Sequence, residues 1–302
     1  MGIMKMHKRF GFTLIEVTLF LAVTAVLFVG ITVGTQGSIW QQRYYDSVQS
    51  FAEFLRTVYS QVSNPQSVGK GNSDTAIYGK LVVFGENYNL AGEEIEESAK
   101  RDYGQQIFVY DVVGRADVTN LGSGSTADLL GVNGARVTAA VPIMDESNKI
   151  IGWTLAGDAT NYVPRWGAEI ETVKDDAGET RSFTGSILIA RNPRSGTINT
   201  LYSTEIIEVN KIVAEANSDP NNNERRNRVE KMIYNWLPGG EEANKFKDKE
   251  FESEQDDLIF CLNPYGYGTR TDNRREIRLD AGARNSSAVQ IIDADSEDNE
   301  CR

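Results

Sequence analysis

The sequence predicts an α+β protein in which one long N-terminal helix precedes a head of mostly antiparallel strands. Three observations support this. A continuous apolar run covers residues 12–33, an apolar stripe at helical spacing follows through residues 39–62, and beyond residue 63 short β-rich runs are bounded by Gly, Asn and Pro. A 3.6-residue period indicates an amphipathic helix, whereas short runs between turn residues indicate strands.

The apolar run is the first element. A stretch of about 20 apolar residues is long enough to cross a bilayer as a helix. Glu16 is the only residue between Phe12 and Val33 that can carry a charge. A carboxylate costs roughly 2.5–3.5 kcal/mol at the centre of a membrane helix and less near its end, so Glu16 needs a partner.

A short basic leader precedes the run, and its sequence carries a resemblance. The order basic leader, Gly11, Phe12, apolar residues and Glu16, written GFTLIE in this chain, resembles the signal segment of type IV prepilins and type II secretion pseudopilins. The resemblance implies that a prepilin peptidase removes residues 1–11, cutting between Gly11 and Phe12, and N-methylates Phe12. The absence of further Lys or Arg until Arg43 also favours a cytoplasmic N-terminus.

The resemblance further implies a role for Glu16 in assembly. In that family the corresponding acid pairs with the N-terminal amine of a neighbouring subunit as the filament grows. An ordinary secretory signal peptide and a plain signal anchor are the alternatives. A secretory signal has an apolar core of about 7–15 residues that ends at a small-residue cleavage site, and this run is longer and contains an acid.

The second part of the helix carries the stripe. We expect one helix over residues 12–62, with residues 12–34 spanning the membrane and residues 35–62 packing against the head. Asn64-Pro65 ends it. Many major pilins have a proline in the span, and its absence here favours a minor pilin or pseudopilin. The stripe consists of Tyr44, Val48, Phe51, Leu55, Val58 and Val62 at alternating steps of four and three.

Residues 63–302 form the predicted head, which we expect to be an exported globular domain in a pilin-like arrangement. One short helix is predicted within residues 218–240, and inserted loops at 85–104, 114–135 and 210–257 are candidates for a surface-binding face. The predicted strands are Ala76–Phe84, Gln105–Val113, Arg136–Ile143, Ile150–Leu155, Ser186–Ala190, Thr197–Tyr202, Glu205–Val209, Leu258–Leu262, Arg275–Leu279 and Ala288–Ile292.

The last third of the chain reads as three strands joined by polar turns. This pattern resembles the closing strands of the heads of H-type, FimT-like minor pseudopilins. Cys261 and Cys301 lie in this part. A head exported to an oxidising compartment favours a disulfide between them, and type IV pilins often have a disulfide near the C-terminus. Two free buried thiols are the alternative.

Charge and composition bear on partners and cofactors. Removal of the leader, with Lys5, Lys8 and Arg9, would change the net charge from −12 to −15. An acidic head makes DNA an unlikely partner, because phosphate contacts need clustered Lys and Arg. The acidic tail offers weak candidates for calcium, since carboxylate oxygens are ligands that Ca²⁺ prefers; otherwise no cofactor or metal is expected. The candidates are Asp293, Asp295 and Glu297.

Catalysis is not predicted. The sole histidine, His7, lies in the leader, so the mature chain has no imidazole for a nucleophile–histidine arrangement. We therefore expect a structural subunit of a pilus or secretion pseudopilus. Its partners would be other subunits, the prepilin peptidase, the inner-membrane assembly platform and lipid. It would reside in the cytoplasmic membrane and then in a surface or periplasmic filament. A major pilin and a tip-displayed adhesive pilin are the alternatives.

Overall fold

The structure is a computed structural model of the chain. Two compact units, Met1–Tyr45 and Asp46–Arg302, make up the chain, and each is described by itself. The described residues are 13–64, 76–85, 88–89, 91–95, 106–114, 137–173, 180–182, 184–192, 196–203, 205–236, 252–253, 257–263, 274–280 and 285–301.

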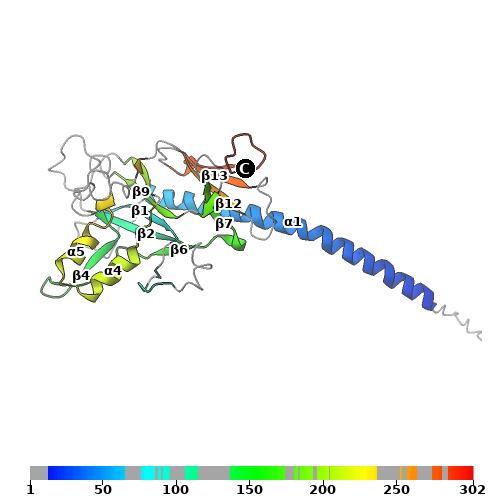
Figure 1. Ribbon diagram of the computed structural model, residues 1–302, viewed down its shortest axis with the longest axis horizontal. Helices are drawn as coiled ribbons and strands as arrows, with labels where there is room; N and C mark the ends of the chain where they lie inside the picture. Colours follow the sequence, from blue (N-terminus) through cyan, green and yellow to red (C-terminus); the bar gives the residue numbers. More distant parts are fainter. Residues whose placement is uncertain are drawn as a thin grey trace, which may run out of the picture. The chain divides into compact units, whose positions relative to one another are not determined.

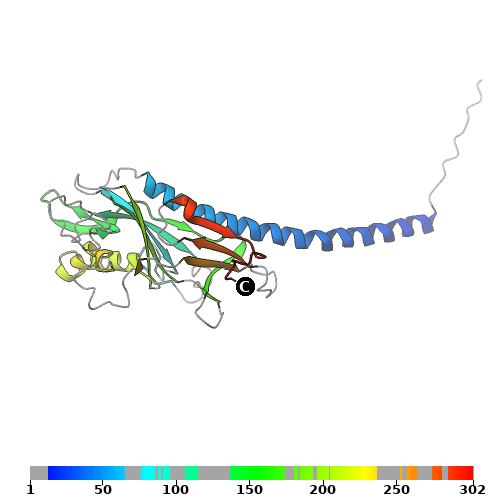
Figure 2. The ribbon, with the colours of Figure 1, turned by 90° about the horizontal axis from the view of Figure 1, so that it is seen from above.

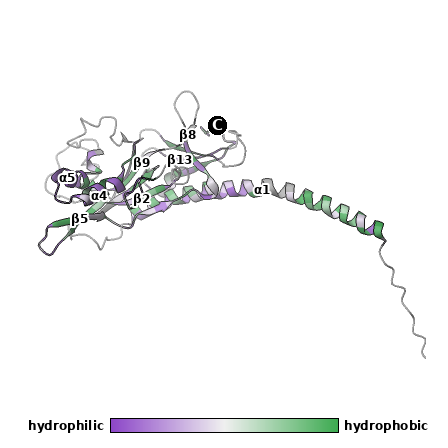
Figure 3. Ribbon diagram, turned by 60° about the horizontal axis from the view of Figure 1, so that its bottom comes forward, coloured by the Kyte–Doolittle hydropathy of each residue, from purple (hydrophilic) through white to green (hydrophobic). Residues whose placement is uncertain are grey.

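The long helix is α1, Leu14–Ser63. The sequence predicts a helix over residues 12–62, and the two agree to within two residues at the N-terminus. Figure 3 shows hydrophobic residues along the N-terminal part of α1 and more hydrophilic ones further along. In the second unit the predicted stripe is buried: Val48, Phe51, Leu55, Val58 and Val62 are each at most 3% exposed.

The larger sheet of the second unit contains seven strands among the described residues, all paired antiparallel (Figure 1). Its order is β11-β10-β9-β1-β2-β3, with β6 also paired to β2. The strands are β1 Ala76–Phe84, β2 Ile107–Gly114, β3 Val137–Thr138, β6 Thr160–Tyr162, β9 Gly185–Arg191, β10 Ile198–Ser203 and β11 Glu252–Ser253.

A second antiparallel sheet has the order β14-β13-β12-β7-β8. It contains the three closing strands that the sequence predicts, together with two strands from the middle of the chain. The strands are β7 Glu169–Val173, β8 Thr180–Ser182, β12 Leu258–Asn263, β13 Arg275–Leu279 and β14 Val289–Ile292. A separate hairpin pairs β4, Ala140–Met144, with β5, Ile150–Leu155.

The larger sheet is buried on both faces. Leu81 and Val83 of β1 belong to a cluster with residues of α4, Val209–Ser218, and α5, Asn223–Glu230. Phe84, one residue beyond Val83, points to the opposite face because side chains alternate along a strand, and there it meets Phe51 of α1. Figure 2 shows strand β1, in cyan, between α1 and the yellow helices.

Helix α1 joins the two sheets through aromatic contacts. The ring of Phe51 lies 6.5 Å from that of Phe84 in the larger sheet and 5.4 Å from that of Phe260 in β12 of the second sheet. Phe84 and Phe260 also stack on each other, with their centroids 5.6 Å apart. The hydroxyls of Tyr59 and Thr200 are 2.7 Å apart, so the helix also has a buried polar contact with β10.

The α+β class is confirmed, but some predicted elements are wrong. The predicted strand Glu205–Val209 is absent, and α4 begins at Val209. The helix predicted within residues 218–240 is confirmed as α5, which Asn222 caps by accepting from the N–H groups of Glu224 and Arg225. Helix α4 is a second helix that the sequence does not predict. The strand predicted over residues 136–143 is divided between β3 and β4. Three short helical turns complete the described structure: η1 Arg165–Gly167, η2 Tyr234–Trp236 and η4 Ser286–Ala288.

Candidate functional site

The first turn of α1 holds the acid that the sequence singles out. Thr13 precedes the helix, and its N–H donates to Glu16 Oε2 at 2.9 Å. The N–H of Glu16 donates in turn to Thr13 Oγ1 at 3.3 Å, and the Thr13 hydroxyl donates to Glu16 Oε2 at 3.0 Å. This reciprocal pair is a capping box, which satisfies two N–H groups that the first helical turn would leave without partners.

The capping box gives Glu16 a role within its own chain. A carboxylate at a helix N-terminus also interacts favourably with the helix dipole. Both hydrogen bonds that the Glu16 carboxylate accepts from Thr13 end on Oε2, so the capping box does not use Oε1. The two residues expected to be processed, Gly11 and Phe12, lie outside the described residues.

The segment Leu14–Thr32 is apolar enough, by length and composition, to cross a membrane. Its large apolar side chains are exposed: Leu14, Phe20 and Val26 are between 67% and 82% exposed. Its threonines satisfy their own hydroxyls, since Thr24 and Thr32 donate to carbonyl groups of the preceding turn at 2.9–3.0 Å. Such internal bonds remove the cost of placing a hydroxyl in lipid.

A disulfide at the other end of the chain joins Cys261 of β12 to Cys301, with the two Cα atoms 5.4 Å apart. Both cysteines are fully buried, and the pair is 40 residues apart in sequence. The tail is therefore covalently fixed to a central strand of the second sheet. This is the pairing that the sequence favours over two free thiols.

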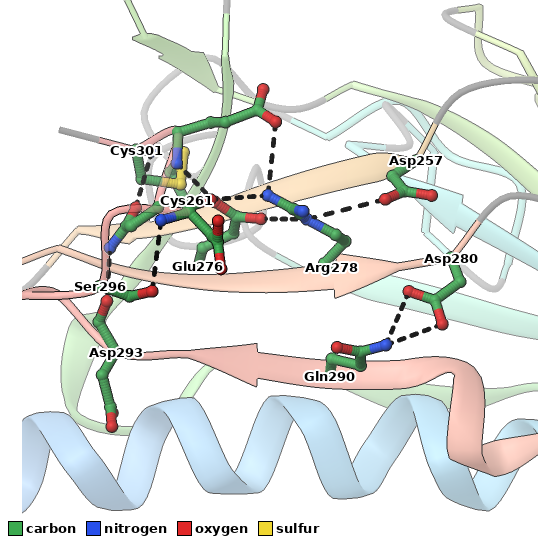
Figure 4. A network of polar contacts seen from close by, with 12 residues as sticks. Asp257, Cys261, Glu276, Arg278, Asp280, Gln290, Asp293, Ser296 and Cys301 are labelled. Atoms are coloured by element: carbon green, nitrogen blue, oxygen red, sulfur yellow. Dashed lines mark hydrogen bonds and ion pairs between the residues drawn. A yellow bond between two sulfur atoms is a disulfide. The ribbon is translucent and has the colours of Figure 1, made fainter.

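A polar network holds the same tail (Figure 4). Glu276 of β13 is fully buried; its Oε1 accepts from Arg278 Nε at 2.5 Å, and its Oε2 accepts from the backbone N–H of Glu300 at 2.7 Å. Arg278 also donates to the carbonyl of Asp298 at 2.8 Å. Each oxygen of the buried carboxylate thus has a donor, as a buried charge requires.

The charge of Arg278 is itself stabilised. Partial burial opposes the charged form, but hydrogen bonding and attraction to Glu276 outweigh it, with Glu300 and Asp257 adding to the effect, so the pKa of Arg278 is raised above its ordinary value. Asn299 completes the network, donating to the carbonyls of Arg274 at 2.8 Å and Asp293 at 3.1 Å. Main-chain and side-chain hydrogen bonds thus hold the tail on the second sheet, and we call this network around Glu276 the clamp.

The calcium candidates lie in this tail but do not converge. Asp293 forms an ion pair with Arg275 at 2.7 Å, and Asp295 and Glu297 are exposed. Within the part of the chain that the structure describes, no three His, Cys, Asp or Glu side chains are grouped so that they could hold a metal ion. The side chain of Asp293 is thus oriented by an arginine, while calcium binding stays an untested prediction.

No family model, curated protein or solved structure matches the chain. The functional proposal therefore rests on the residues and their geometry.

Sequence reasoning identified Glu16 but missed Thr13 as its cap, although Thr-x-x-Glu before an apolar run is a recognisable capping-box pattern. Sequence reasoning also missed the buried Glu276. Nothing in the sequence distinguishes that residue from the many surface acids, because its burial depends on the docking of the tail.

Proposed function

We propose that the chain is a subunit of a type IV pilus or a type II secretion pseudopilus, and that its role is assembly rather than chemistry. The observation that carries the proposal is an exposed apolar helix with one acid, Glu16, in its first turn. The helix continues into a stripe that packs against antiparallel sheets, and a disulfide closes the C-terminal part.

In the proposed mechanism, the segment Leu14–Thr32 first places the precursor in the cytoplasmic membrane. A prepilin peptidase then cuts between Gly11 and Phe12 and methylates the new terminus. The amine of Phe12 on one subunit approaches Glu16 of its neighbour and pairs with it, while the assembly platform lifts the subunit out of the membrane. The exported head remains on the outside of the filament.

A hydrogen bond to a charged group contributes more than a neutral one. An amine–carboxylate bond contributes about 1.5–3 kcal/mol, whereas a helix cap contributes about 1 kcal/mol. An approaching amine can therefore compete successfully for Glu16. It need not break the capping box, because the bonds to Thr13 use only Oε2.

Within this class we propose a minor, tip or assembly-initiating subunit. The predicted head, residues 63–302, is large for a repeating subunit. The helix also contains no proline, since Pro65 is the first proline of the chain, whereas many major pilins have one in the span. A major pilin is the alternative, and the abundance of the chain in sheared filaments distinguishes the two.

A surface-binding pilin at the tip is a second candidate. One observation favours it: the β4–β5 hairpin exposes Ile143, Met144 and Ile151, each at least 40% exposed. Of the loops proposed for this role, residues 115–135 lie outside the described residues, and residues 210–236 are largely α4 and α5.

The decisive experiment separates charge pairing from capping at Glu16. Glutamine can still cap the helix, because its carbonyl oxygen accepts a hydrogen bond as a carboxylate does, but it carries no charge. We expect both Glu16→Gln and Glu16→Ala to insert in the membrane and to be processed. Both should enter sheared filaments at least tenfold less than the wild type, the ratio that a loss of about 1.4 kcal/mol gives.

The matched control is Glu53→Gln, which removes an exposed acid from the same helix; Glu53 forms only a surface ion pair with Arg56. It should assemble normally. If Glu16→Gln assembles like the wild type while Glu16→Ala does not, the acid acts as a cap and the pairing mechanism is wrong.

A further inference from the structure

A cluster of aromatic and basic side chains follows the apolar segment on the same helix. Trp40, Arg43 and Tyr44 lie at positions i, i+3 and i+4, so they share one helix face. The guanidinium carbon of Arg43 is 5.4 Å from the centre of the Trp40 ring, a cation–π contact. Gln41 donates to the hydroxyl of Tyr45 at 3.0 Å. All of these residues belong to the first unit.

This part of the helix is partly accessible: Arg43 and Tyr44 are half-buried, whereas two apolar residues beside them are exposed. Ile39 is 47% exposed and Trp40 is 38% exposed. Tryptophan and tyrosine concentrate at membrane–water interfaces, where their rings meet the acyl chains and their polar atoms meet the headgroups. Arg43 lies one turn further along the helix, and its guanidinium reaches back over the Trp40 ring to the same level. The residue types therefore match a lipid headgroup region better than water.

The length of the helix agrees with this placement. The hydrocarbon core of a bilayer is about 30 Å thick, and about 40–45 Å with the headgroups. At 1.5 Å per residue, the axial distance from Glu16 to Trp40 is about 36 Å, and Arg43 lies about 4.5 Å further along. No charged residue interrupts the sequence between Glu16 and Arg43. Both Glu16 and Trp40 can thus lie just outside the hydrocarbon at the same time.

The directions of the side chains improve the fit. Helical side chains lean toward the N-terminus. Glu16 does so in this structure, since it reaches back to Thr13, and this takes its carboxylate away from the membrane centre. The same lean takes the ring of Trp40 back toward the acyl chains. A helix held in this register does not bury Glu16 deep in the hydrocarbon.

We infer that Trp40, Arg43 and Tyr44 bind the lipid headgroup region of the leaflet that faces away from the chain's N-terminus. This interfacial anchor fixes how far the span sits in the bilayer and keeps Glu16 at the opposite surface before assembly. The inference rests on the membrane-spanning part of the proposed function and is independent of filament formation. The other possible occupant of the face is a helix of a second copy of the chain.

The test measures where Trp40 lies in a bilayer. The full-length chain is reconstituted in phosphatidylcholine vesicles whose acyl chains carry bromine either near the glycerol end or near the methyl end, because bromine quenches tryptophan emission at short range. We expect quenching of the wild type that is stronger with bromine near the glycerol end. Trp40→Phe should lose this lipid-dependent quenching.

The matched control is Trp166→Phe, which removes another exposed tryptophan, 54% exposed in the second unit, and should keep the quenching. Unchanged quenching in Trp40→Phe, or stronger quenching from the methyl end, would overturn the inference. So would quenching that appears only on dilution of the protein in lipid, since that would mean that a second copy covers Trp40. A wild type that does not float with the vesicles would overturn both this inference and the membrane span. A chain that shows the expected quenching but never enters filaments would leave the anchor standing and refute the filament role alone.

Discussion

At the scale of single residues, Glu16 caps its own helix through Thr13, and we propose that it later pairs with the amine of a neighbouring subunit. In the single chain its carboxylate already accepts two hydrogen bonds from Thr13, so the carboxylate is partly stabilised without an amine. The acid therefore stabilises the start of the helix in the single chain, whether or not it also pairs with an amine during assembly. The sequence contains the Thr-x-x-Glu capping pattern as well, but the cost of a charge in lipid directs attention to an external partner instead.

Thr13 provides a test of the cap. Thr13→Val keeps the shape of the side chain but removes the hydroxyl, and loss of a cap costs about 1 kcal/mol. We expect the amide hydrogen of Glu16 to exchange about fivefold faster in micelles, the ratio that such a cost corresponds to. Thr13→Ser keeps the hydroxyl and should exchange like the wild type. Equal exchange in the valine and serine variants would mean that the hydroxyl does not cap the helix.

The buried acid Glu276 illustrates a residue whose role only the fold reveals. Its two oxygens meet Arg278 and the N–H of Glu300, groups that come together only when the tail returns to β13. The sequence predicts calcium weakly in this tail because acids cluster there, but among the described residues no three such side chains are grouped for a metal ion. Asp293, for example, pairs with Arg275.

At the scale of elements, α1 is the part that the sequence predicts best. Its apolar stripe keeps a helical period over many turns, and a proline follows its end, so local and tertiary preferences agree. The same holds for β1, whose bounds, Ala76–Phe84, are those predicted. The segment before α4 misled the prediction because Ile206, Ile207 and Val209 are β-branched residues, which favour strands.

The missed strands have a common cause. β6, β7, β8 and β11 are two to five residues long, and each contains polar or charged residues. Each forms because a longer neighbour offers unpaired backbone groups; β7, for instance, pairs with β12 at Ile170 and Leu262. Because the pairing depends on the adjacent longer strand, the sequence of the short segment alone does not predict it.

The contact between α1 and the two sheets can be tested at Phe51. This side chain is fully buried and touches Phe84 of one sheet and Phe260 of the other. Replacement of a buried Phe by Ala typically costs 3–5 kcal/mol. We expect Phe51→Ala to lower the free energy of unfolding of the head by about that amount, measured by urea unfolding in micelles.

The control for Phe51 lies two residues earlier in the same helix. Gln49 is exposed, and Gln49→Ala should change the unfolding free energy by less than about 0.5 kcal/mol. A loss below about 1 kcal/mol in Phe51→Ala would contradict the packing of α1 against both sheets.

At the scale of the whole molecule, the disulfide fixes the C-terminal tail to the second sheet. A bridge across 40 residues stabilises the fold by about 4 kcal/mol in the chain-entropy model. We expect the double variant Cys261→Ser, Cys301→Ser to unfold at a clearly lower urea concentration than the wild type. Reduction of the wild type should give the same shift. An unchanged midpoint in both cases would show that the polar network alone holds the tail.

In the candidate site, as in the fold, the features that depend on local sequence could be predicted and those that depend on tertiary contacts could not. Gly11, Phe12 and Glu16 are recognisable because they are consecutive parts of one segment, and the two cysteines because they are a single pair. The interfacial anchor at Trp40 and the clamp at Glu276 depend on a helix face and on a tertiary contact. The residues of the anchor are spaced by three and four, which places them on one face only once the helix is assigned, and the residues around Glu276 have no linear pattern.

The central claim is that this chain is a processed filament subunit, and the mass of its natural N-terminus tests it most directly. The chain would be purified from membranes of cells that carry a prepilin peptidase and analysed by mass spectrometry. We predict a first residue of Phe12 bearing one methyl group, and an unprocessed precursor when Gly11→Asp is introduced. A natural chain that begins at any other residue, or that retains residues 1–11, would contradict the account.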